Sequence, residues 1–478
     1  MTGPSGKETP TFHHDQPGTP EHRWLTDPRW AQLPATTPHR LDHRHVVVLS
    51  AHPDDETLGI GATLADLATT GARIDLVIAT DGESSHPGST LWTPGRLGQT
   101  RRTEARHALS LLAPDARLHL LGLPDGRLAD DPAKLLAALQ THLPDLDRNT
   151  VVLAPYPDDG HPDHDLLGAL AHTLAAHTGA DLLHYPIWLW HRSTPDDLDW
   201  SQTTVLTPSA HALHTKRAAL LAHATQTSPL SPLPGDEPLL PRHVLAHFER
   251  VVEVLIAPRT PTRDTPQPHL QPHPRPTRQV PRPDRADTFD ALFEKNDDPW
   301  NENSWYERRK RRLTLSVLAR EHYGSALEIG CATGALTAEL VDRADHVIAT
   351  DISAQALARA RRRDLPRVDW RHDGQLTDLP DHTIDLVVLS EVAYFLTGLE
   401  LLHLLRHAAR VLRPGGEILL VDWRARTEDI PLDGELVHDQ AERMYTGLLR
   451  HRLTYADTDL RIDCWGGPGA LGPHQERR

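Results

Sequence analysis

Two short segments, far apart in the chain, hold the side chains best suited to chemistry. Residues 51–56 read Ala-His-Pro-Asp-Asp-Glu, and residues 160–164 read Gly-His-Pro-Asp-His. Imidazole and carboxylate groups form catalytic zinc sites, in which three protein ligands hold the ion and an open position takes water beside a base. The two segments therefore predict a site for Zn²⁺ or another divalent metal.

The expected ligands follow from the local geometry of the first segment. Proline restricts φ directly after the histidine, and the turn that follows brings residues three apart to one side. His52 and Asp55 can then bind one cation, with His164 as the third ligand. The alternative is an acidic turn without function. It is less favoured, because His-Pro-Asp occurs twice, each time after an apolar strand and with an extra ligand residue attached.

The other side chains of the two segments supply the groups that hydrolysis needs. Asp54 points elsewhere on the turn and is left to take a proton from water. His161 can donate a hydrogen bond to the oxyanion that develops when water attacks a carbonyl, with Asp163 or another acid to orient it. We therefore expect Asp54 and His161 to be catalytic.

Alternating apolar runs and helical patterns place both segments at one edge of a sheet. Strands are expected near 46–49, 74–79, 118–121 and 151–154, and helices near 57–70, 97–112 and 132–143. This alternation predicts an α/β domain with a parallel sheet covered on both faces. His52 follows the first of these strands and His161 the last, so both lie at carboxyl ends of strands, where such sheets form their sites.

A second pattern of this kind predicts a nucleoside-cofactor site. Residues 328–334 read Glu-Ile-Gly-Cys-Ala-Thr-Gly between a predicted strand and a predicted helix, where small residues let the backbone approach a ligand. Asp351 ends the next strand, where an acid can accept hydrogen bonds from both ribose hydroxyls. The Gly-x-Gly-x-x-Gly register of nicotinamide-binding loops is not met.

Composition divides the chain and limits its partners. We expect a disordered or loosely attached arm over 1–43, a metal-site domain over 44–257, a proline-rich linker over 258–285, a cofactor-site domain over 286–465 and a flexible tail over 466–478. The fold is predicted as two doubly wound Rossmann-like domains.

The formal charge of −16 argues against nucleic acid and anionic membranes as partners. Two cysteines and the lack of long apolar runs predict a cytoplasmic protein. Its oligomeric state is not indicated.

The first domain resembles the PIG-L/LmbE family of zinc-dependent N-deacetylases. The likeness covers about residues 44–257 and rests on segments 51–56 and 160–164, with further likeness at 80–83, 101–104, 121–126 and 216–218. The resemblance implies removal of acetyl from an N-acetylglucosamine-type small molecule or glycoside. By position it implies the ligands and catalytic residues named above. It adds Arg101 as a substrate contact, for which an exposed helix charge is the alternative.

The second domain resembles class I S-adenosylmethionine-dependent methyltransferases over about residues 287–465, and among them the NodS type, which N-methylates a de-N-acetylated aminosugar. The likeness includes residues 298–301, 304–308, 390–392 and 414–416. Ala332 departs from the middle glycine of many methyltransferases. By position, the resemblance implies S-adenosyl-L-methionine contacts at Glu328, Gly330, Gly334, Asp351, Asp373 and Ser390.

The two resemblances together suggest one pathway. Because the expected product of the first domain is the expected substrate class of the second, the hypothesis is a bifunctional enzyme that deacetylates an aminosugar and methylates the freed amine. The sequence does not identify the base for methyl transfer. Glu391, Tyr394 and His438 are the candidates for contact with the substrate. The alternatives are methylation on oxygen or on an unrelated substrate, and one catalytically silent domain that regulates its neighbour.

Overall fold

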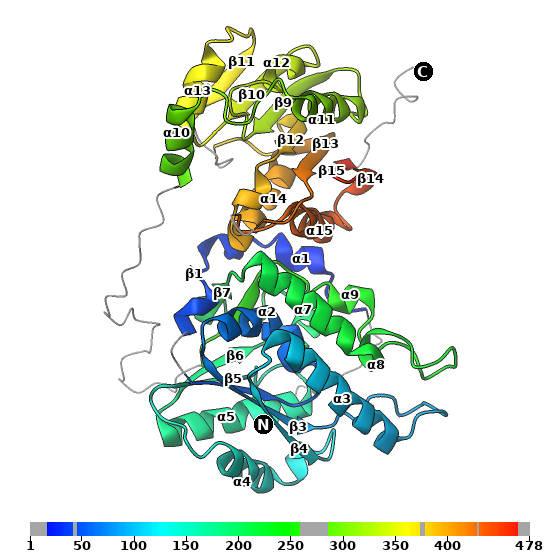
Figure 1. The fold of residues 1–478 in the computed structure, drawn as a ribbon. Coiled ribbons are helices and arrows are strands. Elements are labelled where there is room, and N and C mark those ends of the chain that lie inside the picture. The colour runs from blue at the N-terminus through cyan, green and yellow to red at the C-terminus, as the bar shows by residue number, and fades with distance from the viewer. Residues whose placement is uncertain (1–16, 42–44, 259–284, 373–377, 428–429, 467–478) are drawn as a thin grey trace, which may run out of the picture. The chain divides into compact units, whose positions relative to one another are not determined.

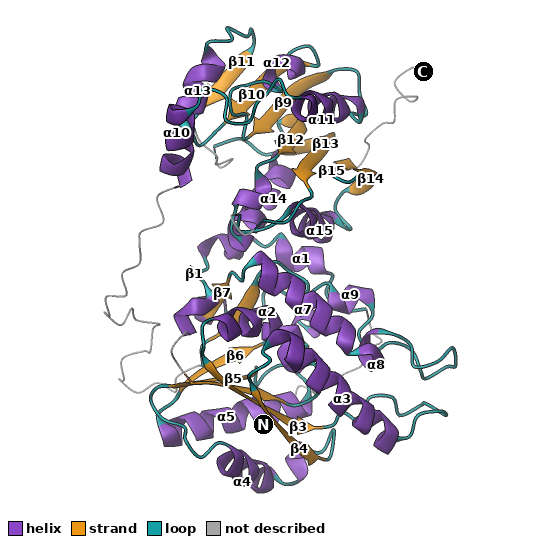
Figure 2. Ribbon diagram, in the orientation of Figure 1, coloured by secondary structure: helices purple, strands orange, loops and turns teal. Residues whose placement is uncertain are grey.

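The computed structural model describes residues 17–41, 45–258, 285–372, 378–427 and 430–466. Contacts divide the chain into two compact units, Met1–Arg259 and Thr260–Arg478. Each unit has its own sheet flanked by helices (Figures 1 and 2), so the predicted α/β class with two Rossmann-like domains is confirmed. Residues 259–284 of the predicted linker and 467–478 of the predicted tail lie outside the described residues. Among the helices that are described, none is long and apolar enough to cross a membrane.

The sheet of the first unit has eight strands in the order β1-β7-β8-β6-β5-β2-β3-β4. Their bounds are β1 (Ala35–Thr36), β2 (His45–Ser50), β3 (Arg73–Thr80), β4 (Arg117–Leu123), β5 (Thr150–Pro155), β6 (Asp181–Tyr185), β7 (Thr203–Leu206) and β8 (Glu253–Ile256). Strands β2 to β6 pair in parallel, whereas β8 runs antiparallel to β6 and β7, which makes the sheet mixed. Strand β2 pairs with β3 on one side and with β5 on the other. The strands that follow β2 are therefore added first on one side of it and then on the other, which makes β2 the topological switch point of the sheet.

Helices cover both faces of this sheet. They are α1 (Glu21–Leu25), α2 (Asp55–Thr69), α3 (Pro94–Leu112), α4 (Pro132–His142), α5 (Pro162–Thr178), α6 (Leu189–Arg192), α7 (Ala210–Ala222), α8 (Ala224–Thr227) and α9 (Arg242–Leu245). Leucines of α4 and α5 pack against alternate residues of β2, such as Val47 and Leu49. Figure 1 shows α2, α3 and α7 on the opposite face.

Residues 17–41 correct the expectation of a loosely attached arm. Trp24 and Trp30 are buried, and the indole N–H of Trp24 donates to the Trp190 carbonyl at 2.8 Å. The Glu21 carboxylate accepts two hydrogen bonds from Arg250, both at 2.6 Å. For residues 17–41 the prediction was wrong because the polar, proline-rich composition outweighed the tryptophans, which supply large apolar surfaces to the core. Residues 1–16 and 42–43 of the predicted arm lie outside the described residues.

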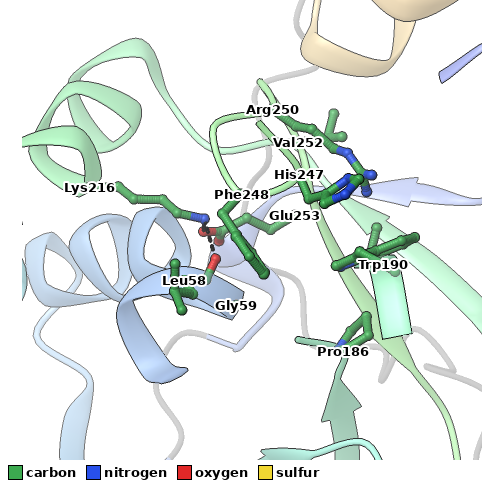
Figure 3. Close-up of a pocket in the computed structure, with 11 residues that line it drawn as sticks. Leu58, Gly59, Pro186, Trp190, Lys216, His247, Phe248, Arg250, Val252 and Glu253 are labelled. Atoms are coloured by element: carbon green, nitrogen blue, oxygen red, sulfur yellow. Dashed lines mark hydrogen bonds and ion pairs between the residues drawn. The ribbon is translucent and has the colours of Figure 1, made fainter. Parts of the chain in front are cut away.

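Helix α2 is interrupted at Ile60, where φ is −141° and ψ is 22°. The backbone groups freed by this break are bonded to side chains rather than to the helix. Glu253 accepts from the amides of Ala62 and Thr63 at 2.9 and 2.7 Å, and Lys216 Nζ donates to the Leu58 carbonyl at 2.7 Å. Lys216 and Glu253 also pair at 2.8 Å, and both line the pocket in Figure 3.

The sheet of the second unit has seven strands in the order β11-β10-β9-β12-β13-β15-β14. Only β15 is antiparallel to its neighbours β13 and β14. The strands are β9 (Tyr323–Ile329), β10 (Ala344–Thr350), β11 (Val368–Arg371), β12 (Ile384–Ser390), β13 (Leu412–Trp423), β14 (Arg450–Ala456) and β15 (Leu460–Gly466). The helices are α10 (Arg285–Lys295), α11 (Trp305–Ser316), α12 (Thr337–Leu340), α13 (Ala354–Arg361), α14 (Gly398–Val411) and α15 (Gly434–Tyr445).

Candidate active sites

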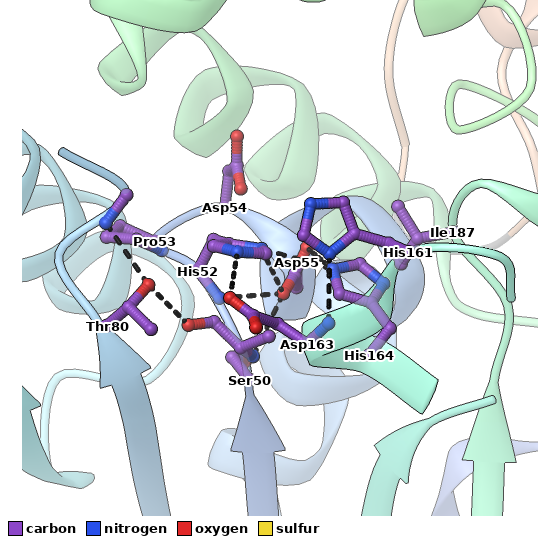
Figure 4. A network of polar contacts seen from close by, with 12 residues as sticks. Ser50, His52, Pro53, Asp54, Asp55, Thr80, His161, Asp163, His164 and Ile187 are labelled. Atoms are coloured by element: carbon purple, nitrogen blue, oxygen red, sulfur yellow. Dashed lines mark hydrogen bonds and ion pairs between the residues drawn. The ribbon is translucent and has the colours of Figure 1, made fainter. Parts of the chain in front are cut away.

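The structure brings His52, Asp55 and His164 together at the carboxyl ends of β2 and β5. Nδ1 of His52 lies 3.1 Å from Nε2 of His164 and 3.6 Å from Oδ2 of Asp55, and His164 Nε2 lies 3.3 Å from Asp55 Oδ1 (Figure 4). Two ligand atoms bound to one tetrahedral zinc ion at 2.0–2.1 Å are about 3.4 Å apart. The spacing and the donor types therefore fit a divalent cation.

Backbone geometry holds these three side chains in place. Asp55 is the first residue of α2, and its Oδ2 accepts from the amides of Ala51 and His52 at 3.0 and 2.9 Å. Pro162 opens α5, which puts His164 in the first turn of that helix with no exposed surface. Both histidines are thus carried by rigid strand-to-helix turns on neighbouring strands.

Three carboxylates surround the two imidazoles, and the sequence analysis did not single out two of them, Asp125 and Asp159. Asp159 Oδ2 lies 2.7 Å from His164 Nδ1, and the same carboxylate accepts from the amides of residues 187–189. On the other side, Asp125 and Asp163 lie 3.1 and 3.4 Å from His52 Nε2. Such partners orient ligand imidazoles. Asp163 therefore faces His52, whereas we had expected it to orient His161.

Arg101 is buried against the metal-site turn and is not the exposed helix charge considered above. Its guanidinium donates to the carbonyls of Gly82 and Pro53, each at 2.8 Å, and lies 3.3 Å from Asp54 Oδ2. Asp54 has a φ of 133°, which is strained for a residue with a side chain. Figure 4 shows its carboxylate directed away from Asp55. The Arg101 contacts are with the protein backbone and Asp54.

The predicted cofactor residues of the second unit gather at the carboxyl ends of β9, β10 and β12. Gly330 has a φ of 78°, and a Cβ at Gly330 would lie 2.8 Å from the Val392 side chain, so only glycine fits. Asp351 accepts from the amide of Ala332 at 2.8 Å, which ties the glycine-containing loop to the next strand. Glu328 is buried and accepts from Thr337 at 2.5 Å.

The remaining cofactor candidates have different outcomes. Gly334 also has a φ of 78°, and Ser390 is the last residue of β12. Asp373 lies outside the described residues. Helix α12 begins at Thr337, so the turn after Gly334 is longer than expected. Adjacent strand ends, a glycine turn and an acid on the neighbouring strand form a surface that suits a nucleoside cofactor.

The substrate-side candidates form two connected groups. Glu391 accepts from the hydroxyls of Tyr306 and Tyr394 at 3.0 and 2.5 Å, and Lys310 Nζ lies 3.3 Å from it. His438 is instead buried between two carboxylates, with Nδ1 2.6 Å from Asp463. The sequence analysis did not single out Lys310 or Asp463, since each depends on a partner from a distant element.

Comparison with known proteins bears on both sites. The family model of the GlcNAc-PI de-N-acetylases (PIG-L) matches residues 47–175. A 1D-myo-inositol 2-acetamido-2-deoxy-alpha-D-glucopyranoside deacetylase of Nakamurella multipartita is 30% identical over 264 residues, which cover 44% of this chain and 86% of that protein. The chain belongs to the PIG-L family.

The second unit of this PIG-L protein matches a methyltransferase domain model over residues 326–416. Nodulation protein S of Rhizobium tropici is 31% identical over 128 residues, which cover 26% of this chain and 54% of that protein, so the chain spans about half of this relative. The solved N-methyltransferase NodS from Bradyrhizobium japonicum, in complex with S-adenosyl-l-homocysteine, is 23% identical with a TM-score of 0.32, covering 37% of this chain and 98% of that chain. A PIG-L deacetylase domain is thus joined to a methyltransferase domain.

Carboxylates set the protonation of the PIG-L site. Burial lowers the pKa of His52, but Asp125, Asp163 and Asp55 outweigh it and raise the pKa well above its ordinary value. Burial also lowers the pKa of His164, and Asp55 outweighs it, which raises that pKa to about 9. A cation that binds here must displace protons from the imidazoles.

The two predicted catalytic residues of the PIG-L site have opposite shifts. Burial raises the pKa of Asp54 to about 7, although Arg101 lowers it. Burial lowers the pKa of His161, and the charges of His52 and His164 lower it further, so its imidazole is neutral. Its Nδ1 accepts from the Asp163 amide at 3.3 Å, so its proton lies on Nε2, which is then a donor.

Proposed function

We propose that the protein is a bifunctional enzyme that removes the acetyl group from an N-acetylglucosamine-type aminosugar and then methylates the freed amine. The observation that carries the proposal is the meeting of His52, Asp55 and His164 within 3.1–3.6 Å of one another, in a chain that also has a methyltransferase domain. Relatives of the first domain are named as deacetylases of a 2-acetamido-2-deoxyglucopyranoside, and a relative of the second is NodS.

In the first domain His52, Asp55 and His164 would hold Zn²⁺ or another divalent metal. The ion would supply Lewis-acid activation of the water and of the amide carbonyl. Asp54 takes a proton as the water oxygen bonds to the carbonyl carbon, and the Nε2–H of His161 donates to the oxyanion that forms. The carbon–nitrogen bond then breaks, acetate leaves, and the amine departs with a proton returned by Asp54.

In the second domain S-adenosyl-L-methionine would supply an electrophilic methyl group. Glu328, Gly330, Gly334, Asp351 and Ser390 would form its site, since they line adjacent strand ends. The chain then has to align an amine and remove one proton from it. Glu391 and Tyr394 lie at the end of β12, on the side of the sheet edge away from Asp351.

The first test is mass spectrometry of a panel of N-acetylglucosaminides incubated with the full chain. We expect loss of acetyl without S-adenosylmethionine, followed by gain of one methyl group on nitrogen when the cofactor is added. A chelator should abolish acetate release, and added Zn²⁺ should restore it. Methylation on oxygen, or of a compound unrelated to the deacetylated product, would contradict the second half of the proposal.

A variant test addresses the base. Asp54→Asn should lose acetate release while its zinc content stays at one ion per chain. The matched control is Asp130→Asn, an exposed carboxylate of the same unit paired with Arg127, which should behave as the unmodified protein. Full activity in the Asp54 variant would remove this residue from the base role. A metal-dependent domain that binds zinc but hydrolyses no member of the panel would favour a silent, regulatory domain.

A further inference from the structure

Two tryptophans beside the proposed methyl-transfer site are exposed to solvent and have no role in the chemistry proposed above. Trp305 is the first residue of α11 and is 67% exposed, and Trp423 is the last residue of β13 and is 38% exposed. An indole has a large apolar surface, which is stabilised by burial. Exposed apolar side chains that gather at the edge of a site mark a surface for a ligand.

Trp305 is held next to Glu391 by its neighbour in the helix. The hydroxyl of Tyr306 donates to Glu391 Oε1 at 3.0 Å, which puts the first turn of α11 at the carboxyl end of β12. One helical turn further, the guanidinium of Arg309 lies 5.3 Å from the Trp305 ring centre and donates to the Tyr455 hydroxyl at 2.6 Å. The Trp305 indole therefore lies at the carboxyl edge of the sheet, toward β14.

Trp423 reaches the same edge from β13. The Glu391 amide donates to the Val421 carbonyl at 2.8 Å, and Trp423 follows two residues later, at the carboxyl end of the strand. Alternate residues of a strand face the same side of the sheet. Val421 belongs to the apolar cluster against which Leu313 of α11 packs, so Trp423 faces the α11 side as well.

Polar groups of the turn between β14 and β15 flank both indoles. Arg309, which lies against Trp305, pairs with the Asp457 carboxylate. Arg424, which follows Trp423, donates to the carbonyl of the same aspartate. Asp457 thus joins the flanks of the two indoles, and its neighbourhood supplies donors and acceptors for hydroxyl groups.

Apolar faces with a polar rim suit a pyranose ring. Such a ring presents C–H groups on its faces and hydroxyl groups around its edge, so it packs on an indole while its hydroxyls reach polar side chains. The cofactor is not the expected occupant, because its proposed residues lie on β9 and β10 and at the end of β12, whereas the two indoles lie beyond β12 on the β13 side. A third exposed indole, Trp300, packs instead against Phe293 of α10.

We propose that Trp305 and Trp423 bind the pyranose ring of the methyl acceptor and so restrict the acceptor to cyclic aminosugars. This deepens the proposed N-methylation and rests on it. The indoles act on binding and not on the chemical step, since an indole has no group that accepts a proton from an amine. An interaction that holds substrate and transition state equally lowers KM and leaves kcat unchanged.

The test measures methylation of glucosamine by the full chain with saturating S-adenosylmethionine. In Trp305→Ala and in Trp423→Ala we expect KM for glucosamine to rise by about 10-fold, with kcat within about twofold. Trp305→Phe keeps an aromatic face and should recover most of this loss. Binding of S-adenosylmethionine, measured by calorimetry, should stay within about twofold, and the melting temperature should not fall, because the side chains removed are exposed.

A second acceptor tests for the ring itself. Serinol carries an amine between two hydroxymethyl groups but has no ring. The unmodified chain should methylate serinol at least about 10-fold less efficiently than glucosamine, and the alanine variants should change its kcat/KM by no more than about twofold. An equal loss for glucosamine and serinol would show that the indoles do not bind a ring.

Leu453→Ala is the matched control. Leu453 is 38% exposed on β14 and lies opposite Cys464, which pairs with Leu419, four residues before the end of β13. This variant removes exposed apolar surface from the same sheet, away from its carboxyl edge, and should keep the KM of the unmodified protein.

The outcomes separate this inference from the proposed function. If the unmodified chain methylates glucosamine on nitrogen and both alanine variants keep its KM, the inference is wrong while N-methylation stands. A lower kcat at unchanged KM, or loss of the cofactor together with a lower melting temperature, also overturns it, because the indoles would then have a catalytic or structural role. If the unmodified chain does not methylate the nitrogen of glucosamine, both proposals fall.

Discussion

Arg101 and Asp54 meet in a buried ion pair, with Nη2 3.3 Å from Oδ2, while the same Nη2 donates to the Pro53 carbonyl at 2.8 Å. One guanidinium therefore fixes both the turn between His52 and Asp55 and the direction of the proposed base. A lysine cannot bond two carbonyls and a carboxylate in this planar arrangement. The proposed chemistry consequently depends on a residue that belongs to α3 and contacts no ligand of the metal site through its side chain.

Arg101→Lys is expected to lower deacetylation by about 100-fold, because a small misplacement of a catalytic group has an effect of this size. Zinc content should be unchanged. Arg102→Lys is the control, since this neighbouring guanidinium is paired with Asp81 on the partly exposed side of α3. Acetate release and metal analysis on the purified variants check the prediction. Equal activity of the two variants would show that Arg101 does not position Asp54.

Asp159→Asn is expected to weaken zinc affinity by about 10–100-fold, because Asp159 orients the imidazole of His164 at 2.7 Å. Competition with a fluorescent chelator measures this affinity. Asp165→Asn is the matched control. Asp165 accepts from the Gly160 amide of the same loop and makes no hydrogen bond to His164 among the described contacts. A similar loss of affinity in both variants would mean that loop structure, and not the imidazole contact, is responsible.

Much of the candidate metal site could be predicted from the sequence because its residues lie on short local patterns. The position of a histidine directly after an apolar strand is fixed by the end of that strand. Two such strands in one parallel sheet bring their carboxyl ends to the same edge. Asp125 and Asp159 could not be predicted in the same way. Each contacts a histidine from another loop, and acids in turns are too common to single out.

Other parts of the fold depend on long-range partners that local patterns do not reveal. Helix α2 was expected from its leucines, but its break at Ile60 is stabilised by Lys216 and Glu253, which are far away in the chain. Likewise, the tryptophans near the N-terminus are buried against distant residues: Trp24 contacts Trp190 of α6, and Trp30 contacts Trp200 and Arg250. Spacing along the chain carries no information about such contacts.

The Lys216–Glu253 pair provides a stability prediction. Lys216→Met or Glu253→Gln should each lower the free energy of unfolding of the first unit by about 3–5 kcal/mol, because each leaves a buried charge or backbone group unpartnered. The double variant should lose less than the sum, since the two side chains share one network. Denaturant unfolding measures this, with the exposed Lys134→Met as control. Additive losses would contradict a shared role in supporting the helix break.

Glu21 provides the prediction for pH. Burial raises the pKa of its carboxyl, but Arg250 and His247 outweigh this and hold it below the ordinary value of 4.5. A group with a lowered folded pKa contributes stability above its unfolded pKa, and this contribution is lost as the pH falls below 4.5. The melting temperature of Glu21→Gln should therefore lie below that of the unmodified protein at pH 7, and the two should converge in acid.

Tryptophan fluorescence measures this convergence, because Trp24 and Trp30 belong to the segment that Glu21 anchors. Asp130→Asn, which removes an exposed carboxylate of the same unit, should follow the unmodified protein at every pH, since an exposed ion pair contributes little. A gap between Glu21→Gln and the unmodified protein that persists unchanged to pH 3 would mean that the hydrogen-bonding shape of the side chain, and not its charge, holds residues 17–41 against the first unit.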